Sequence, residues 1–277
     1  MSARRGFSLA ELLVAMLLAG IIGLALARLV ISQARFVAGQ DGMLQARSTA
    51  RAALNVLSAD LRALTPGSLR AATRDSITVR VPYAFGVACQ QGSGGTNVSL
   101  IPGDSSIYNT ATASGYAFRD STGVWQFVEP ATVAGGSCAP TGPSITTLGA
   151  TGWAATVVKA SPNDARTREG DLVYLYQVVR FALAPSTTLP GRLALWRTVL
   201  STGSRDELAA PFDTGSTIQF LVGSRLTVRT TPPSLLDSVR GVRVRLVGQS
   251  ERAPEGKGAP SRFDLSTNIV FRNNELP

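Results

Sequence analysis

The feature that most constrains the fold of this chain is an apolar run close to its N-terminus. From Leu12 to Ala27 no charged or strongly polar side chain occurs, and residues 7–27 contain Glu11 as their only charge. At about 1.5 Å per residue, a helix of this length spans roughly 30 Å, the thickness of a bilayer core. The run therefore predicts a transmembrane helix. Glu11 needs a separate explanation, because a charge inside such a helix costs about 2.5–3.5 kcal/mol.

The small residue that normally follows the apolar run of a secretory signal here precedes it. Cleavage between Gly6 and Phe7 would remove only a basic leader, residues 1–6, and would leave the helix in the mature chain. This order resembles the class III signal of type IV pilins and type II secretion pseudopilins, and the resemblance covers roughly the first thirty residues. It implies cleavage after Gly6 by a prepilin peptidase and methylation of the new amine of Phe7.

The same resemblance implies that Glu11 pairs with the terminal amine of a neighbouring subunit during filament assembly. An ammonium group at Phe7 and a carboxylate at Glu11 are each costly in hydrocarbon, and pairing lowers the cost of both. The two groups are also one helical turn apart within one chain. An intramolecular pair, favoured by the helix dipole, is therefore the alternative.

Beyond the predicted span, 7–28, an amphipathic pattern continues as a stalk helix over 29–65. Its apolar positions recur at intervals of three, four or seven, which predicts one face packed on a sheet; they are Phe36, Met43, Ala50, Leu54, Leu57, Leu61 and Leu64. Thr65-Pro66-Gly67 should end the helix, because proline cannot continue the hydrogen-bond ladder. Four glycines, Gly20, Gly23, Gly39 and Gly42, are expected weak points of the helix.

Residues 66–277 read as a β-rich globular domain, so the predicted fold class is α+β: a pilin-like long N-terminal helix packed on an antiparallel sheet with a loop insertion near 89–138. Strands are predicted from β-branched and aromatic content at Ser76–Val81, Val124–Val128, Ala155–Lys159, Leu172–Leu183, Arg192–Leu200, Thr217–Val222, Arg225–Arg229, Val239–Val247 and Asp264–Arg272. The run from Gln90 to Gly115 is rich in Gly, Ser, Thr and Asn, which predicts a loop. Trp125, Trp153 and Trp196 are expected in the core.

The chain has two cysteines, Cys89 and Cys138, both after the predicted span. In an exported domain they would form one disulfide that closes a loop of about fifty residues and stabilises the fold by about 3–4 kcal/mol. Two unrelated buried thiols are the alternative, because the sequence does not show whether their Cα atoms approach.

The formal net charge is +9, which removal of Arg4 and Arg5 would lower to +7. A basic surface can attract nucleic acid or anionic lipid. The arginines are scattered, however, and no aromatic platform accompanies them. Within 239–246 they alternate with apolar residues, which is typical of a solvated sheet face. Weak nucleic-acid binding remains an alternative.

No catalytic set emerges, so an enzyme is not predicted and no cofactor or metal is expected. Histidine is absent, which removes the commonest general base and metal ligand. The two cysteines lack metal-ligand spacing. A cation site from Asp206, Glu207 and Asp213 is a minor alternative to three solvated carboxylates.

Three further segments narrow the resemblance to particular subunit types. Residues 50–62 resemble the stalk end of the minor pilin W and pseudopilin J families, and 239–246 with 265–273 resemble the closing strands of minor pilin W. These likenesses imply a minor subunit that initiates or caps assembly of a type IV pilus, with other minor pilins or pseudopilins as partners. The alternatives are a minor pseudopilin of a type II secretion system and a pilus-associated module that binds DNA or a surface. The implied location is the bacterial inner membrane, with one span, the globular domain outside the cytoplasm, and the filament tip after assembly.

Overall fold

A computed structural model describes residues 9–92, 94–104, 107–108, 111–139, 142–144, 156–255 and 257–271. One helix, α1 (Leu9–Arg62), precedes an antiparallel β-sheet. The strands are β1 (Leu69–Ala72), β2 (Ser76–Gly92), β3 (Gly95–Leu100), β4 (Gly115–Arg119), β5 (Trp125–Val128), β6 (Thr132–Gly135), β7 (Val157–Ser161), β8 (Leu172–Pro185), β9 (Leu193–Val199), β10 (Arg205–Phe212), β11 (Thr217–Val222), β12 (Thr227–Arg229), β13 (Val239–Gln249) and β14 (Arg262–Val270). Two short 3₁₀ helices, Pro102–Asp104 and Leu236–Ser238, complete the described elements.

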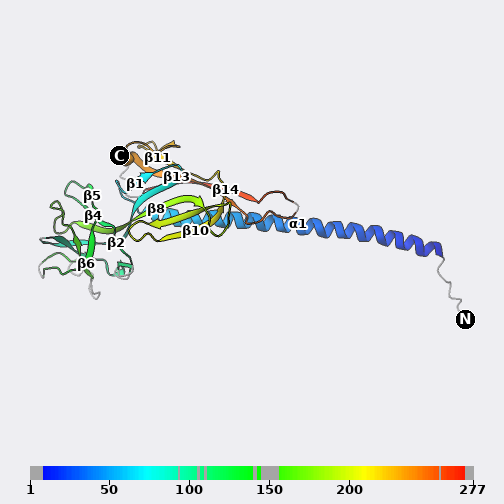
Figure 1. Ribbon diagram of the computed structural model, residues 1–277, viewed down its shortest axis with the longest axis horizontal. Helices are drawn as coiled ribbons and strands as arrows, with labels where there is room; N and C mark the ends of the chain where they lie inside the picture. Colours follow the sequence, from blue (N-terminus) through cyan, green and yellow to red (C-terminus); the bar gives the residue numbers. More distant parts are fainter. Residues whose placement is uncertain are drawn as a thin grey trace.

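The molecule is elongated, because only the C-terminal part of α1 lies along the sheet (Figure 1). The N-terminal part of α1 projects from one end, and β4, β5 and β6 lie at the other end. This arrangement confirms the predicted fold class, a pilin-like α+β protein with a long apolar N-terminal helix on an antiparallel sheet.

The two longest strands, β2 and β8, hold the sheet together. They pair from Ser76 with Ala182 to Val87 with Leu172. Across the sheet the order is β12-β11-β13-β10-β9-β8-β2-β3-β7-β6, with β14 beside β13, β1 beside β2, and the β4–β5 hairpin beside the N-terminal half of β8. Consequently β2 and β8 run continuously from one half of the sheet into the other.

Each half of the sheet has its own apolar core. The helix-side core joins the C-terminal part of α1 to the inner face of the sheet; its fully buried members include Leu57, Leu61, Ile77, Phe181, Phe220 and Val242. The second core, called the distal core here, is formed by β3, β4 and β7 and by the parts of β2 and β8 next to them. It includes Val98, Leu100, Tyr116, Phe118, Val158 and Leu175. Different segments of β2 and β8 supply the two cores: the N-terminal part of β2 and the C-terminal part of β8 belong to the helix-side core, and their other ends belong to the distal core.

The turn after α1 explains where the helix ends. The helix stops at Arg62, close to the predicted end at Leu64, and Pro66 follows. Gly67 has φ +79°, and a Cβ at this position would lie 3.0 Å from Cε2 of Phe127. The positive φ therefore favours glycine at the turn, and a Cβ there would also crowd the Phe127 ring.

The prediction of a loop over Gln90–Gly115 is wrong for part of that range. Residues up to Gly92 still belong to β2, and β3 follows, hydrogen-bonded to both β2 and β7. Polar residues of β3 such as Thr96 and Ser99 are buried. Their composition is that of a loop, but the strand is specified by its two neighbours. Strands β1, β4, β6 and β10 were also not predicted.

The tryptophans differ in environment. Trp196 on β9 is 6% exposed and lies under the guanidinium of Arg205, 4.0 Å from the ring centroid. Trp125 on β5 is half-buried and packs against Tyr174. Trp153 lies outside the described residues.

Glu207 on β10 stabilises the turn between β8 and β9 through hydrogen bonds. Its carboxylate accepts hydrogen bonds from the Ser186, Thr187 and Thr188 hydroxyls and from the backbone N–H of Thr187. Desolvation alone would raise the pKa of Glu207, but these donors outweigh it and hold the pKa at about 2. The ionised side chain is thus part of the fold rather than a free surface charge.

We expect Glu207 to contribute stability that is present above pH 4.5 and is lost as the pH falls toward about 2, because the unfolded chain takes up the proton first. Glu207→Gln should therefore lose less stability than the wild type between about pH 5 and about pH 3. Urea unfolding of the full chain in non-ionic detergent measures this difference. Asp206→Asn, at the exposed neighbouring carboxylate, is the control. Identical pH profiles of wild type and Glu207→Gln would contradict the assignment.

Candidate functional site: the N-terminal helix and its packing on the sheet

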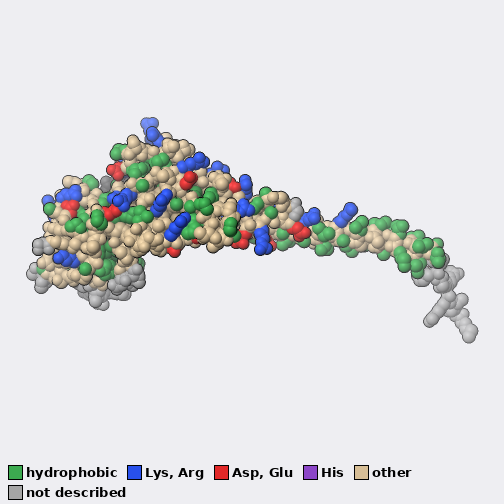
Figure 2. Space-filling model, in the orientation of Figure 1, with side chains coloured by type: hydrophobic (Ala, Val, Ile, Leu, Met, Phe, Trp, Pro, Cys, Tyr) green, Lys and Arg blue, Asp and Glu red, His purple; other side chains and the backbone are tan. Residues whose placement is uncertain are grey.

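The first half of α1 is apolar and unburied. Large hydrophobic side chains from Leu9 to Leu44 are at least 41% exposed, and Figure 2 shows the projecting helix as a largely hydrophobic surface. By length and composition, α1 contains a segment able to cross a membrane. Gly20 and Gly23 lie within this continuous helix and have no atoms near their Cβ positions.

Glu11 lies in the first turn of the described helix and is exposed. Negative charge in that turn is favourable for the helix dipole. Gly6 and Phe7, the residues predicted to flank the cleavage site, lie outside the described residues.

The second half of α1 is fixed to the sheet through one narrow face. The fully buried residues are Ala46, Ala50, Ala53, Leu57 and Leu61, spaced by three or four. Phe36 and Met43, which the same pattern placed on this face, are 67% and 41% exposed. The predicted packing on the sheet is therefore wrong for them, because β13 meets the helix at Ala46, beyond both residues.

Small residues set how closely the helix approaches the sheet. Gly248 on β13 lies directly against the helix backbone, so a Cβ there would overlap the carbonyl oxygen of Ala46. A Cβ at Gly42 would lie 3.1 Å from Ser261 Oγ and 3.4 Å from the ring of Pro254. Gly39 lies close to the end of Lys257. Gly39 and Gly42, expected as weak points, are instead the positions where the β13–β14 loop packs on the helix.

Polar contacts reinforce this packing. Asp60 on α1 pairs with Arg197 on β9 at 3.5 Å. Burial raises the pKa of Asp60, and the arginine partly offsets that rise. Further toward the membrane segment, Arg47 lies over the ring of Phe263, 5.5 Å from its centroid.

The end of α1 is also connected to the distal half of the sheet. Thr65 Oγ1 lies 2.6 Å from the Tyr174 hydroxyl, within the aromatic cluster next to the distal core. Arg80 donates to the carbonyl of Gly67 at 2.8 Å and pairs with Glu129 at 3.1 Å. The helix is therefore joined to both halves of the sheet.

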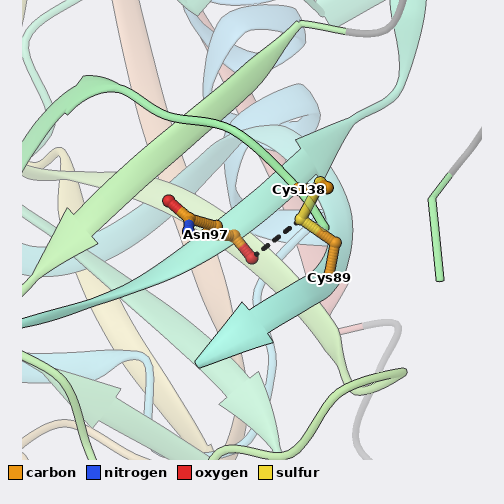
Figure 3. Close-up of a disulfide and its surroundings, with 3 residues drawn as sticks. All are labelled: Cys89, Asn97 and Cys138. Atoms are coloured by element: carbon orange, nitrogen blue, oxygen red, sulfur yellow. Dashed lines mark hydrogen bonds between the residues drawn. A yellow bond between two sulfur atoms is a disulfide. The ribbon is translucent and has the colours of Figure 1, made fainter. Parts of the chain in front are cut away.

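Cys89 and Cys138 form a disulfide in the structure, with Cα atoms 5.5 Å apart (Figure 3). The bond connects β2 to the segment that follows β6. Cys89 Sγ also lies 3.4 Å from the carbonyl oxygen of Asn97. Because a disulfide sulfur carries no proton, this approach is a packing contact rather than a hydrogen bond.

Arg243 and Arg245 of β13 alternate with Val242, Val244 and Leu246 of the helix-side core, so they lie on the opposite face of the strand. Arg243 donates to Asn268, and Arg245 pairs with Asp264 on β14. These pairs match the solvated sheet face predicted for 239–246. Likewise, Glu207 and Asp213 bind protein donors, and no metal-binding group of three or more His, Cys, Asp or Glu occurs within the described ranges.

Comparison with known proteins gives one match. Residues 1–27 match the family model of the prokaryotic N-terminal methylation motif. No curated protein and no solved structure matches the chain. The motif supports a type IV pilin-like or pseudopilin protein, and it implies processing by prepilin peptidase and association with other pilins. Together with the apolar helix it supports anchoring in the inner membrane.

Gly248→Ala should destabilise the fold by about 1–3 kcal/mol, since the added methyl group must separate α1 from β13. Gly135→Ala is the matched control, because Gly135 is also a strand glycine and has no atoms near its Cβ position. Chemical unfolding of both full-length variants in detergent measures the difference. Equal unfolding midpoints would show that the close approach of α1 to β13 contributes little to the free energy of unfolding.

Proposed function

We propose that this protein is a minor pilin-like structural subunit that helps initiate or cap assembly of a type IV pilus. The observation that carries the proposal is the division of α1: its N-terminal half is apolar and uncovered, while its C-terminal half is fixed to the sheet. An apolar helix needs a bilayer or neighbouring apolar helices around it. A filament subunit finds both, first in the membrane and then in the fibre.

The β-rich part supports a low-copy position in the filament. It holds two apolar cores and a disulfide-linked distal region, and it is bulky relative to the helix that carries it (Figure 1). A subunit repeated along a shaft must pack laterally against many copies, whereas one at the tip has fewer such contacts. The disulfide also suits a domain outside the cytoplasm, where oxidising conditions preserve it.

A minor pseudopilin of a type II secretion system is the second candidate, since residues 50–62 resemble both subunit types. A nucleic-acid-binding role has less support, because Arg245 is ion-paired with Asp264 and the arginines are scattered along the sequence without an aromatic platform.

The proposal predicts that the mature chain begins at N-methylated Phe7. Intact-mass and N-terminal analysis of protein purified from its native membrane, with and without the peptidase, tests this. A chain that still begins at Met1 despite an active peptidase would reduce the protein to a singly anchored β domain.

Glu11→Ala should insert and be cleaved normally, yet lose co-purification with other pilin-like subunits by about tenfold or more, because the neighbouring amine loses its charged partner. Asp41→Ala, at an exposed carboxylate of the same helix beyond the apolar run, is the control. Mass spectrometry of the co-purified subunits distinguishes pilus from secretion components. Normal co-purification of Glu11→Ala would remove the pairing role of Glu11 and leave the intramolecular pair.

A further inference from the structure

A cavity of about 340 Å³ lies where five strand ends meet at one edge of the helix-side core. It is bounded by the ends of β8, β10 and β13 and the starts of β9 and β14; the residues that matter are Pro185, Arg192, Leu193, Phe212, Gln249 and Arg262. Ser250, next to Gln249, packs on Gly42. The cavity therefore lies at the end of the sheet from which the uncovered half of α1 emerges.

Two arginines on the cavity wall are connected by a chain of hydrogen bonds; Arg192 is bound to the buried Gln249, whereas the side chain of Arg262 is 60% exposed. Arg192 donates to the side-chain carbonyl of Gln249 at 2.7 Å, and the Gln249 amide donates to Asp213 at 2.7 Å. Arg262 pairs with the same Asp213 oxygen at 3.0 Å. Gln249 is 2% exposed, so a buried amide fixes the relative positions of the arginine and the carboxylate.

This chain of hydrogen bonds leaves the arginines with unused donors. A guanidinium has five N–H groups, and within the described residues Arg192 and Arg262 each use one of them. Asp213 is already occupied, because its other oxygen accepts from the backbone N–H of Gly215. Two cations and one anion give the cavity wall a formal charge of +1, which matches a monovalent anion.

We infer that this cavity binds a carboxylate carried on an apolar group. Guanidinium forks match carboxylate geometry, and Arg192, which the buried Gln249 already orients, loses little entropy on binding. Pro185, Leu193 and Phe212 supply an apolar wall beside the arginines, which suits an organic acid better than a hydrated phosphate. The carboxylate comes either from a free small acid or from a neighbouring protein chain; the second source rests on the proposed function.

Ligand-observed ¹⁹F NMR on the full chain in non-ionic detergent tests the site with two probes. Free 4-fluorobenzoate represents a small acid, with 4-fluorobenzamide as its neutral control. Acetyl-4-fluorophenylalanyl-aspartyl-amide represents a protein side chain, with the asparaginyl peptide as its control. We expect each acid that binds to do so about tenfold or more tightly than its neutral control. The acid with the greater affinity identifies the source.

Arg192→Gln and Arg262→Gln should each weaken binding of the acid by about tenfold, whereas Arg243→Gln, on β13 outside the cavity, should not. Circular dichroism and the unfolding midpoint verify that each variant is folded. Equal binding of the neutral controls, equal loss in Arg243→Gln, or displacement of the acid by inorganic phosphate at the same concentration would overturn the carboxylate site. None of these results depends on filament assembly, so the site and the proposed function fail separately.

Discussion

The close contact between α1 and β13 divides the helix into a half that is buried on the sheet and a half whose apolar side chains are exposed. Ala46 and Ala50 lie against Gly248, and from there to Leu61 the helix buries one face in the core. N-terminal to that contact only the β13–β14 loop of the described chain touches the helix, at Gly39 and Gly42, and every residue of 9–37 is exposed. Hydrophobic burial is the main favourable term for such a surface, so the uncovered half must find its apolar surroundings outside this chain. The contact therefore determines which part of the helix is structural and which is available to a membrane or to other subunits.

The sequence indicated this helix well but not the point of division. Leu12 to Ala27 and the later apolar spacing specify helix throughout. Phe36 and Met43 follow the same period as Leu57 and Leu61, however, and a period does not reveal how far a sheet extends. That limit comes from the β13–β14 loop, which packs on Gly39 and Gly42, and from the missing side chain at Gly248. These are tertiary contacts between residues about two hundred positions apart. The sequence shows that glycines occur at these positions, but it does not show what packs against them.

The strands also show how far local sequence can predict the fold. Strand β8 was predicted because Val173, Leu175 and Val179 give it strong β character and it is bordered by turn residues. Strand β3, by contrast, has two polar residues that are buried only because β2 and β7 pair on either side of it. Strand β10 begins with charged residues, and Glu207 among them acts as a hydrogen-bond acceptor for a turn formed by β8 and β9. In both strands the neighbours supply the stability, so local propensity could not reveal them. At the candidate site, the position of Glu11 in the apolar run is visible in the sequence, and its pairing role stays a prediction from the family resemblance. The cavity beside Arg192 depends on five strand ends that only the fold brings together.

The matched motif and the β-rich part carry different kinds of information. The motif covers residues 1–27, and under the proposed function this is the part of the chain that shaft and tip subunits share. Differences in position and partner must then arise beyond residue 27, in the rest of α1 or in the β-rich part. Within the β-rich part, the distal core with its disulfide and the arginine-lined cavity next to the base of α1 lie at opposite ends of the sheet. Strands β2 and β8 run through both cores, and Thr65 and Gly67 connect the end of α1 to the distal half. Both ends of the sheet are therefore linked to the helix by one continuous set of paired strands and hydrogen bonds, so a partner at either end would be linked to the helix through the same contacts.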